Sequence, residues 1–313
     1  MRHKIRILGI IIVLLLTKIQ AQQDPQYTQY MYNMSVLNPA YTTDTPSILN
    51  FGMLYRSQWQ NAVGAPKTLT FFAHTPLSEK IEVGLSVVSD DIGDGALKEN
   101  NIYADFAYIL KLDDESNISL GLKGGFTAFE TNFGGFRLPQ FEDDPAFNED
   151  LNNTYPNIGV GAFYHRKNFY AGISSPNLLT SKHLENTNGI SSLGSEAIHV
   201  FGMMGYVFDG IPDFKIKPSV LAKTAQNSPF TFDASMNVLF KNRFEGGVSY
   251  RLEDSVSAMF NFAVLPTLRI GYSYDYTLSN LGDFNDGSHE IFALFDLDLL
   301  GIRKGYDKSP RFY

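Results

Sequence analysis

The chain has 313 residues, of which 44% are hydrophobic, and it carries 25 Phe and 17 Tyr but a single Trp. It has no cysteine, which excludes disulfides, cysteine-ligated metals and a cysteine nucleophile. The formal charge of −8 argues against a nucleic-acid-binding protein, because such a protein needs a basic surface. A mean hydropathy of −0.13 fits a soluble protein but also a membrane barrel, in which lipid-facing and lumen-facing residues average out.

Residues 1–21 have the pattern of a secretory signal peptide. Arg2, Lys4 and Arg6 precede the apolar run 7–16, and Ala21 offers a small residue for cleavage. The apolar run is too short for a transmembrane helix, although a membrane anchor that stays attached is the alternative. We therefore expect an exported protein with a cleaved signal peptide.

Residues 22–46 are expected to form an N-terminal periplasmic arm or a plug of the barrel predicted below. Pro25, Pro39 and Pro46 interrupt a stretch rich in Tyr, Asn and Gln, which makes it a poor strand or helix. The segment either fills the lumen or docks on a periplasmic partner, with an unstructured lead-in as the alternative. The C-terminal tail, 301–313, is expected on the same side of the membrane, because an even number of strands brings both chain ends to one side.

From residue 47 to residue 300 apolar and polar residues alternate at a period of two, which is typical of β-strands. In the segment 268–278, for example, Ile270, Tyr272 and Tyr274 alternate with Arg269 and Asp275. No segment of helical length has a convincing helical apolar stripe. About fourteen strands are expected, at 47–60, 67–76, 81–89, 99–112, 116–131, 156–166, 168–175, 196–208, 214–224, 230–241, 243–253, 255–265, 268–278 and 288–300.

This pattern fits either a soluble sandwich, with its apolar face inside, or a membrane barrel, with its apolar face toward lipid. Charged residues such as Lys217, Asp233, Arg251 and Arg269 all fall on one parity of their strands. A Lys or Arg facing lipid at mid-depth would cost about 2–4 kcal/mol, so this confinement is informative. The signal peptide and the strand lengths favour an all-β fold, namely a transmembrane antiparallel β-barrel of about 14 strands.

Candidate catalytic and metal-binding chemistry is sparse. The histidines are scattered over different strands and no Gly-x-Ser-x-Gly motif is present, so we expect no enzyme activity and no cofactor. Residues 90–95 resemble a calcium loop without its final Glu, and a hairpin turn is the preferred interpretation, with no metal site expected. The acidic stretch 142–150 is expected to be a solvated extracellular loop, or else a site for divalent ions that bridge lipopolysaccharide. Gly121, Gly159 and Gly161 suit tight curvature and close strand packing.

Several blocks of sequence resemble one protein family in order along the chain. The first is Asp24-Pro25-Gln26-Tyr27-Thr28-Gln29-Tyr30-Met31-Tyr32-Asn33, followed by Leu37-Asn38-Pro39-Ala40-Tyr41. Further along come Arg56-Ser57-Gln58-Trp59 with Pro66-Lys67-Thr68, then Gly271-Tyr272-Ser273-Tyr274-Asp275 with Leu278-Ser279, and Ser288-His289-Glu290-Ile291. The ordered set, which spans nearly the whole mature chain, resembles the PorP/SprF family of outer-membrane proteins tied to type IX secretion and gliding in Bacteroidota.

The resemblance implies a non-enzymatic outer-membrane component of type IX secretion. The expected role is to assist export or surface attachment of a secreted partner, such as a large adhesin with a C-terminal sorting domain. The alternatives are a core component bound to the periplasmic ring proteins, or a porin-like channel. The expected partners are outer-membrane lipid and lipopolysaccharide, the type IX periplasmic ring proteins and the secreted adhesin with its C-terminal sorting domain. Nucleic acid is not an expected partner.

Two groups of residues are candidates for the functional site. The first is expected to dock a partner, with its tyrosines as aromatic anchors: Asp24, Pro25, Gln26, Tyr27, Tyr30, Tyr32, Asn38, Pro39 and Tyr41. The second is expected to form a polar cluster in the lumen or at strand ends: Arg56, Trp59, Arg269, Asp275, His289 and Glu290. Glu290 is predicted to pair with Arg56 or Arg269.

Overall fold

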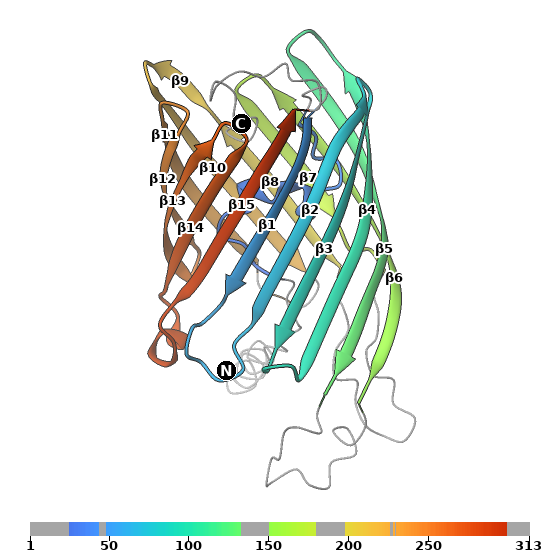
Figure 1. The fold of residues 1–313 in the computed structure, drawn as a ribbon, viewed down its shortest axis with the longest axis vertical. Helices are drawn as coiled ribbons and strands as arrows, with labels where there is room; N and C mark the ends of the chain where they lie inside the picture. The colour runs from blue at the N-terminus through green and yellow to red at the C-terminus, as the bar shows by residue number, and fades with distance from the viewer. Residues whose placement is uncertain are drawn as a thin grey trace, which may run out of the picture.

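The wall of the protein is one antiparallel sheet that closes on itself as a barrel (Figure 1). The computed structural model describes residues 25–43, 48–132, 150–179, 198–225, 228 and 230–298. Neighbours along the chain pair with each other, and β1 pairs with β15 to close the sheet, with Ile48 opposite Asp298. The strands are β1 (Ile48–Ser57), β2 (Lys67–Ser78), β3 (Ile81–Ile92), β4 (Leu97–Lys111), β5 (Ser116–Thr131), β6 (Asn152–Arg166), β7 (Phe169–Ser175), β8 (His199–Tyr206), β9 (Phe208–Ile211), β10 (Phe214–Ala225), β11 (Thr231–Phe240), β12 (Phe244–Arg251), β13 (Ser255–Leu265), β14 (Leu268–Thr277) and β15 (Ser288–Asp298).

The wall has fourteen strand positions, because β8 and β9 are two parts of one strand. Both pair with β10, and they are separated by Val207, whose N–H donates instead to the Asn168 carbonyl. The predicted antiparallel barrel of about fourteen strands is therefore confirmed. The predicted segment 196–208 covers β8 but misses the interruption and most of β9. No helix among the described residues is long and apolar enough to cross a membrane.

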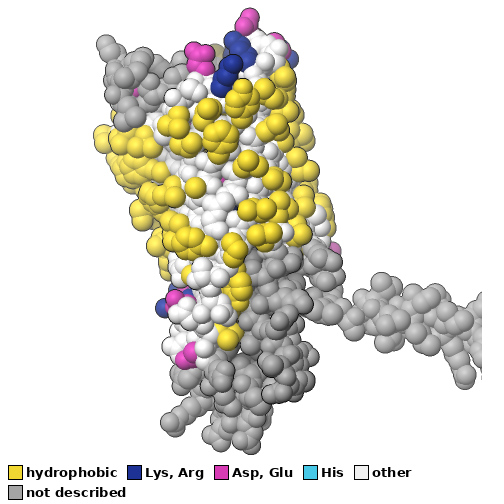
Figure 2. Space-filling view, turned by 90° about the vertical axis from the view of Figure 1, so that its right-hand side faces the viewer, with side chains coloured by type: hydrophobic (Ala, Val, Ile, Leu, Met, Phe, Trp, Pro, Cys, Tyr) yellow, Lys and Arg dark blue, Asp and Glu magenta, His cyan; other side chains and the backbone are white. Residues whose placement is uncertain are grey.

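Alternating side chains give the wall an apolar outside and a polar inside. Met236, Val248 and Phe260 are 44%, 59% and 52% exposed, whereas Asp233 and Arg251 on the same strands face inward and are buried. Figure 2 shows hydrophobic side chains over the middle of the wall, with charged side chains gathered toward its two ends. This is the inverted pattern of a barrel that faces lipid.

The two ends of the barrel differ in their connections. At the short-turn end, strands are joined by residues 79–80, 112–115, 167–168, 212–213, 241–243 and 266–267. At the long-loop end, the connections include 58–66, 132–151, 176–198 and 278–287, the last of which contains the 3-10 helix η3 (Asn280–Phe284). Ile48 and Asp298, where the barrel begins and ends, both lie at the short-turn end (top of Figure 1).

Residues 25–43, which we call the arm, lie inside the barrel. The arm contains only a short 3-10 helix, η1 (Tyr30–Tyr32), and one helical turn, α2 (Met34–Leu37). Near its start the Tyr27 carbonyl accepts from Arg251, the last residue of β12 at the long-loop end. Near its end the Thr43 N–H donates to Glu82, the second residue of β3 at the short-turn end. The arm therefore runs along the lumen from one end of the barrel to the other.

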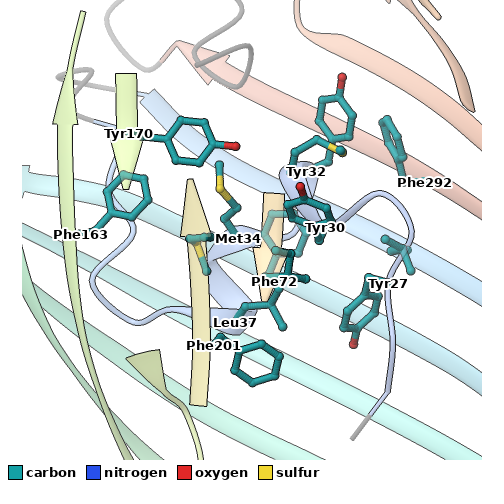
Figure 3. Packing of buried hydrophobic residues seen from close by; sticks show 14 of the residues in the cluster. Tyr27, Tyr30, Tyr32, Met34, Leu37, Phe72, Phe163, Tyr170, Phe201 and Phe292 are labelled. Carbon is teal, nitrogen blue, oxygen red and sulfur yellow. The ribbon is translucent and has the colours of Figure 1, made fainter. Parts of the chain in front are cut away.

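The arm supplies seven of the seventeen buried residues in the main hydrophobic cluster. Its apolar side chains pack against inward-facing residues of the wall, as Figure 3 shows for Tyr30, Met34 and Leu37. The wall contributes Leu54, Phe72, Phe163, Tyr170, Phe201, Met203, Leu221, Met259, Phe292 and Leu294. Of the segments predicted from sequence, the signal peptide 1–21, the ends of the arm at 22–24 and 44–46, the acidic stretch 142–149 and the tail 301–313 lie outside the described residues.

Candidate functional site

One charged contact between arm and wall is built on Arg56. Its Nη2 donates to Asp275 Oδ2 at 2.8 Å, and its Nη1 donates to Glu290 Oε2 at 3.2 Å and to Thr28 Oγ1 at 2.9 Å. The Thr28 hydroxyl in turn donates to Asp275 at 2.7 Å. Glu290 also accepts the N–H groups of Thr28 at 3.0 Å and Gln29 at 2.8 Å. We call Arg56, Asp275, Glu290 and Thr28 the Arg56 clamp.

The clamp is buried and carries one more negative than positive charge. The side chains of Arg56 and Asp275 are 2% exposed, and that of Glu290 is 0% exposed. Buried ions are tolerated where hydrogen bonds satisfy them, and the excess carboxylate here is satisfied by two N–H groups of the arm. The N–H groups of Thr28 and Gln29 therefore complete the hydrogen bonding of the buried Glu290 carboxylate.

The clamp brings together four sequence blocks that carried the family resemblance. Thr28 comes from the first block, Arg56 from the block at 56–59, Asp275 from the block at 271–275 and Glu290 from the block at 288–291. Arg56 lies on β1, Asp275 on β14 and Glu290 on β15, which are adjacent in the closed sheet. The predicted pairing of Glu290 with Arg56 occurs in the structure.

The other three residues of the predicted polar cluster lie elsewhere. His289 faces outward, because it precedes Glu290 in a strand, and its Nδ1 lies 2.7 Å from the Tyr272 hydroxyl. Trp59 is in the β1–β2 loop, where its N–H donates to the Ser288 hydroxyl. Arg269 faces the lumen toward the short-turn end and donates to the Asn242 carbonyl at 3.2 Å.

A second polar seat receives the Tyr32 hydroxyl. It donates to Glu245 Oε2 and accepts from Asn261 Nδ2 at 3.1 Å. The Tyr32 ring lies 4.7 Å from that of Phe292 between centroids, and the Lys217 ammonium is 5.4 Å from the ring centroid. Tyr32 thus joins the hydrophobic core to a charged part of the wall.

Replacing Tyr32 with phenylalanine is expected to destabilise the folded barrel by about 1–3 kcal/mol, because buried Glu245 and Asn261 lose a hydrogen-bond partner. The measurement is the urea midpoint of the electrophoretic mobility shift between folded and heat-unfolded protein. Tyr276→Phe is the control, since Tyr276 is 62% exposed on the outer wall, and its midpoint is expected to stay unchanged. Equal shifts for the two variants would contradict the assignment.

The third seat, which we call the glycine seat, consists of Gly121, Gly161 and Gly172. A Cβ atom at Gly121 would lie 2.2 Å from the Ala40 nitrogen, and one at Gly161 would lie 2.1 Å from Asn38 Oδ1. A Cβ at Gly172 would lie 2.8 Å from Asn38 Nδ2. The interpretation of these wall glycines as curvature residues is therefore incomplete, since Gly121 and Gly161 leave room for residues 38–40.

The residues predicted to dock a partner are packed within the barrel, except that Asp24 lies outside the described residues. Tyr27, Tyr30, Tyr32 and Asn38 are at most 5% exposed. Several wall residues that hydrogen-bond the arm were not predicted from the sequence: Glu245 and Asn261, which contact Tyr32, and Glu82, Lys123, Ser119 and Ser174, which contact other residues of the arm. The alternation along each strand predicts that these side chains face the lumen, but it does not predict which of them contact the arm.

Solved structures similar to this chain are outer-membrane proteins of low sequence identity. The outer membrane protein Omp33 of Acinetobacter baumannii is 9% identical, covers 81% of this chain and 100% of its own, and gives a TM-score of 0.47. A mutant of the monoaromatic hydrocarbon channel TodX is 9% identical, with coverages of 85% and 94% and a TM-score of 0.49. A FadL homologue of Pseudomonas aeruginosa is 13% identical, with coverages of 85% and 94% and a TM-score of 0.45.

The sequence comparisons identify the family. No curated protein sequence matches the chain. The family described as type IX secretion system membrane protein PorP/SprF matches residues 19–295, which include the arm and almost the whole barrel. Together with the closed barrel and its apolar outer wall, this match makes the chain an outer-membrane protein that belongs to the PorP/SprF family of type IX secretion system membrane proteins.

Proposed function

We propose that this protein is a non-enzymatic component of type IX secretion that assists export or surface attachment of a partner protein, such as a large adhesin with a C-terminal sorting domain. The observation that supports this most directly is the arm, which occupies the lumen from one end to the other. A lumen filled by part of its own chain suits a barrel that acts through contacts with proteins. It suits passive diffusion of solutes less well.

The unequal ends of the barrel suggest how it is oriented. Bacterial outer-membrane barrels carry short turns on the periplasmic side and longer loops on the cell surface. By this rule the short-turn end faces the periplasm, where the ring proteins are expected. The long-loop end, with connections 132–151 and 176–198, faces the surface, where an attached adhesin and lipopolysaccharide are expected.

The proposed role is tested by deleting the gene and measuring which proteins disappear from the cell surface. Loss of one secreted protein, or of a few, is the expected result for a component that serves particular partners. Loss of all type IX substrates would favour the core role at the periplasmic ring instead. An unchanged surface together with impaired uptake of a nutrient would overturn the proposal in favour of a channel.

The filled lumen also predicts the electrical behaviour of the purified protein. In planar bilayers the full-length protein is expected to give no stable conductance steps, because the arm occupies the lumen. Removal of residues 25–43 is expected to produce discrete open-channel steps, with folding checked by the mobility shift on heating. Equal conductance of the two proteins would contradict the assignment of the arm as a plug and would favour the porin-like alternative.

A further inference from the structure

The inner wall binds the arm largely through main-chain atoms of the arm. Six side chains on five strands donate to its carbonyls or accept from its N–H groups. The wall residues are Glu290 (with the N–H of Thr28 and Gln29, 3.0 and 2.8 Å), Arg251 (with the Tyr27 carbonyl, 3.3 Å), Lys123 (Val36 carbonyl, 3.2 Å), Ser174 (Leu37 carbonyl, 2.7 Å), Ser119 (Ala40 carbonyl, 2.6 Å) and Glu82 (Thr43 N–H, 3.1 Å). Recognition through main-chain hydrogen bonds, with pockets for a few side chains, is one way in which proteins bind peptide segments.

The wall also contacts side chains of the arm. The Tyr27 and Tyr30 hydroxyls lie 2.9 and 3.3 Å from those of Thr70 and Ser235, and three further positions have polar contacts of their own. The Thr28 hydroxyl enters the Arg56 clamp, and the Tyr32 hydroxyl reaches Glu245. The Asn38-Pro39-Ala40 turn fits the glycine seat, where the Asn38 amide donates to the Ala162 carbonyl at 3.2 Å. The wall therefore selects a hydroxyl residue, a tyrosine and a compact Asn-Pro turn at fixed spacings.

The arm fits its site incompletely. Four of its polar side chains are buried with atoms that have no hydrogen-bond partner among the described residues: Gln29, Asn33, Ser35 and Thr42. Burying a polar group without a partner costs about 1–3 kcal/mol. A peptide that carries apolar or better-paired side chains at these positions would bind the same wall more tightly than the arm does.

The arm is held in place partly by its covalent attachment. It has little secondary structure of its own, and in the sequence only four residues separate Thr43 from Ile48, the first residue of β1. A short connection gives a tethered segment an effective concentration of about millimolar, which holds even an imperfect ligand in its site. A pocket lies beside the start of the arm, and its lining includes Pro25 and Gln26 of the arm and Phe201, Leu221 and Lys223 of the wall.

We propose that the inner wall is a binding site for a polypeptide segment with little regular secondary structure, that the arm is its tethered and replaceable occupant, and that a segment of the partner protein takes the arm's place. The ligand class is a segment with a Thr or Ser, a Tyr four residues later and an Asn-Pro-small turn six residues after that, as in the arm. That the partner is a secreted protein rests on the proposed function. The peptide site itself does not.

The test begins with the full chain, folded with its arm in place. A recognition sequence for a specific protease is inserted between Thr43 and Ile48, and the purified protein is cut after folding. A fluorescent synthetic peptide of residues 25–43 is then added. Saturable binding is expected after the cut and not before it, because cutting removes the effective concentration of the tethered arm.

Two variant peptides make the test specific. The Thr28→Val peptide loses a hydrogen bond to a buried carboxylate and is expected to bind about 10- to 100-fold more weakly. The Asn33→Leu peptide removes an unpaired buried amide and is expected to bind at least as tightly as the natural peptide. A peptide of scrambled sequence is expected not to bind.

Two results would overturn the proposal. One is a cut barrel that keeps its heat-dependent mobility shift but never exchanges its arm for excess labelled peptide. The other is equal binding of the natural, Thr28→Val and scrambled peptides. Peptide exchange is measured without any secretion assay, so its failure is distinct from an unchanged cell surface after gene deletion, which would overturn only the proposed function.

Discussion

Replacing Arg56 with methionine is expected to destabilise the folded barrel by about 3–5 kcal/mol, because the carboxylates of Asp275 and Glu290 remain buried without their cation. The methionine preserves most of the side-chain volume, so the loss is one of charge and hydrogen bonding. The urea midpoint of the mobility shift measures the stability of the variant. Protease sensitivity of residues 25–43 should rise in parallel, since Arg56 also donates to the Thr28 hydroxyl.

A charge-neutral version of the same site is the matched comparison. In the triple variant Arg56→Met, Asp275→Asn and Glu290→Gln, no ion is left unpaired, and most of the lost stability is expected to return. Arg166→Met serves as the surface control, because Arg166 and Glu115 form a pair whose side chains are both 57% exposed, and it is expected to change the midpoint little. A triple variant as unstable as Arg56→Met would show that unpaired charge is not the cause.

Gly161→Ala is expected to push the arm out of its seat. The added Cβ would lie 2.1 Å from Asn38 Oδ1 and 3.2 Å from Pro39 Cδ. Asn38 has little freedom to retreat, because its Oδ1 accepts the Ala40 N–H at 2.9 Å and its Nδ2 donates to the Ala162 carbonyl. Overpacking of this kind costs about 1–3 kcal/mol. We expect protease cleavage within residues 25–43 and channel-like conductance from a barrel that is still folded.

The control for this variant is a second glycine on a neighbouring strand. A Cβ at Gly124 on β5 would meet no atom within 4 Å, since this residue faces outward. Gly124→Ala should therefore leave both arm protection and the absence of conductance unchanged. If Gly161→Ala behaves like Gly124→Ala in both measurements, the glycine seat does not hold the arm.

Much of the fold was predictable because strand periodicity is local. Short turns such as 266–267 separate segments whose alternation is clear, so strand number and facing were available from sequence. The break of one strand into β8 and β9 was not, because Val207 continues an apolar stretch and only the pairing with β7 and β10 shows that it leaves the ladder. The apolar periodicity of a strand predicts which face of the sheet a side chain lies on, but it does not predict which residue of a neighbouring strand it pairs with.

The same limit explains the partial success at the functional site. Arg56 and Glu290 are far apart in sequence and become neighbours only because β1 pairs with β15. Adjacent residues of a strand point to opposite faces, so of His289 and Glu290 at the start of β15 only Glu290 lines the lumen. The role of Gly161 had no local signal, because the atoms that need its space belong to Asn38.

The Arg56 clamp straddles the seam of the barrel, and this constrains biogenesis. Thr28 touches Arg56 on β1 and, through its N–H, Glu290 on β15, the first and last strands of the sheet. If β1 paired with β15 before the arm was in place, residues 25–43 would have to thread into the closed barrel from one of its ends. No threading is needed if residues 25–43 bind to the inner face of the sheet before the barrel closes. We therefore expect β1 and β15 to pair only after the arm has bound.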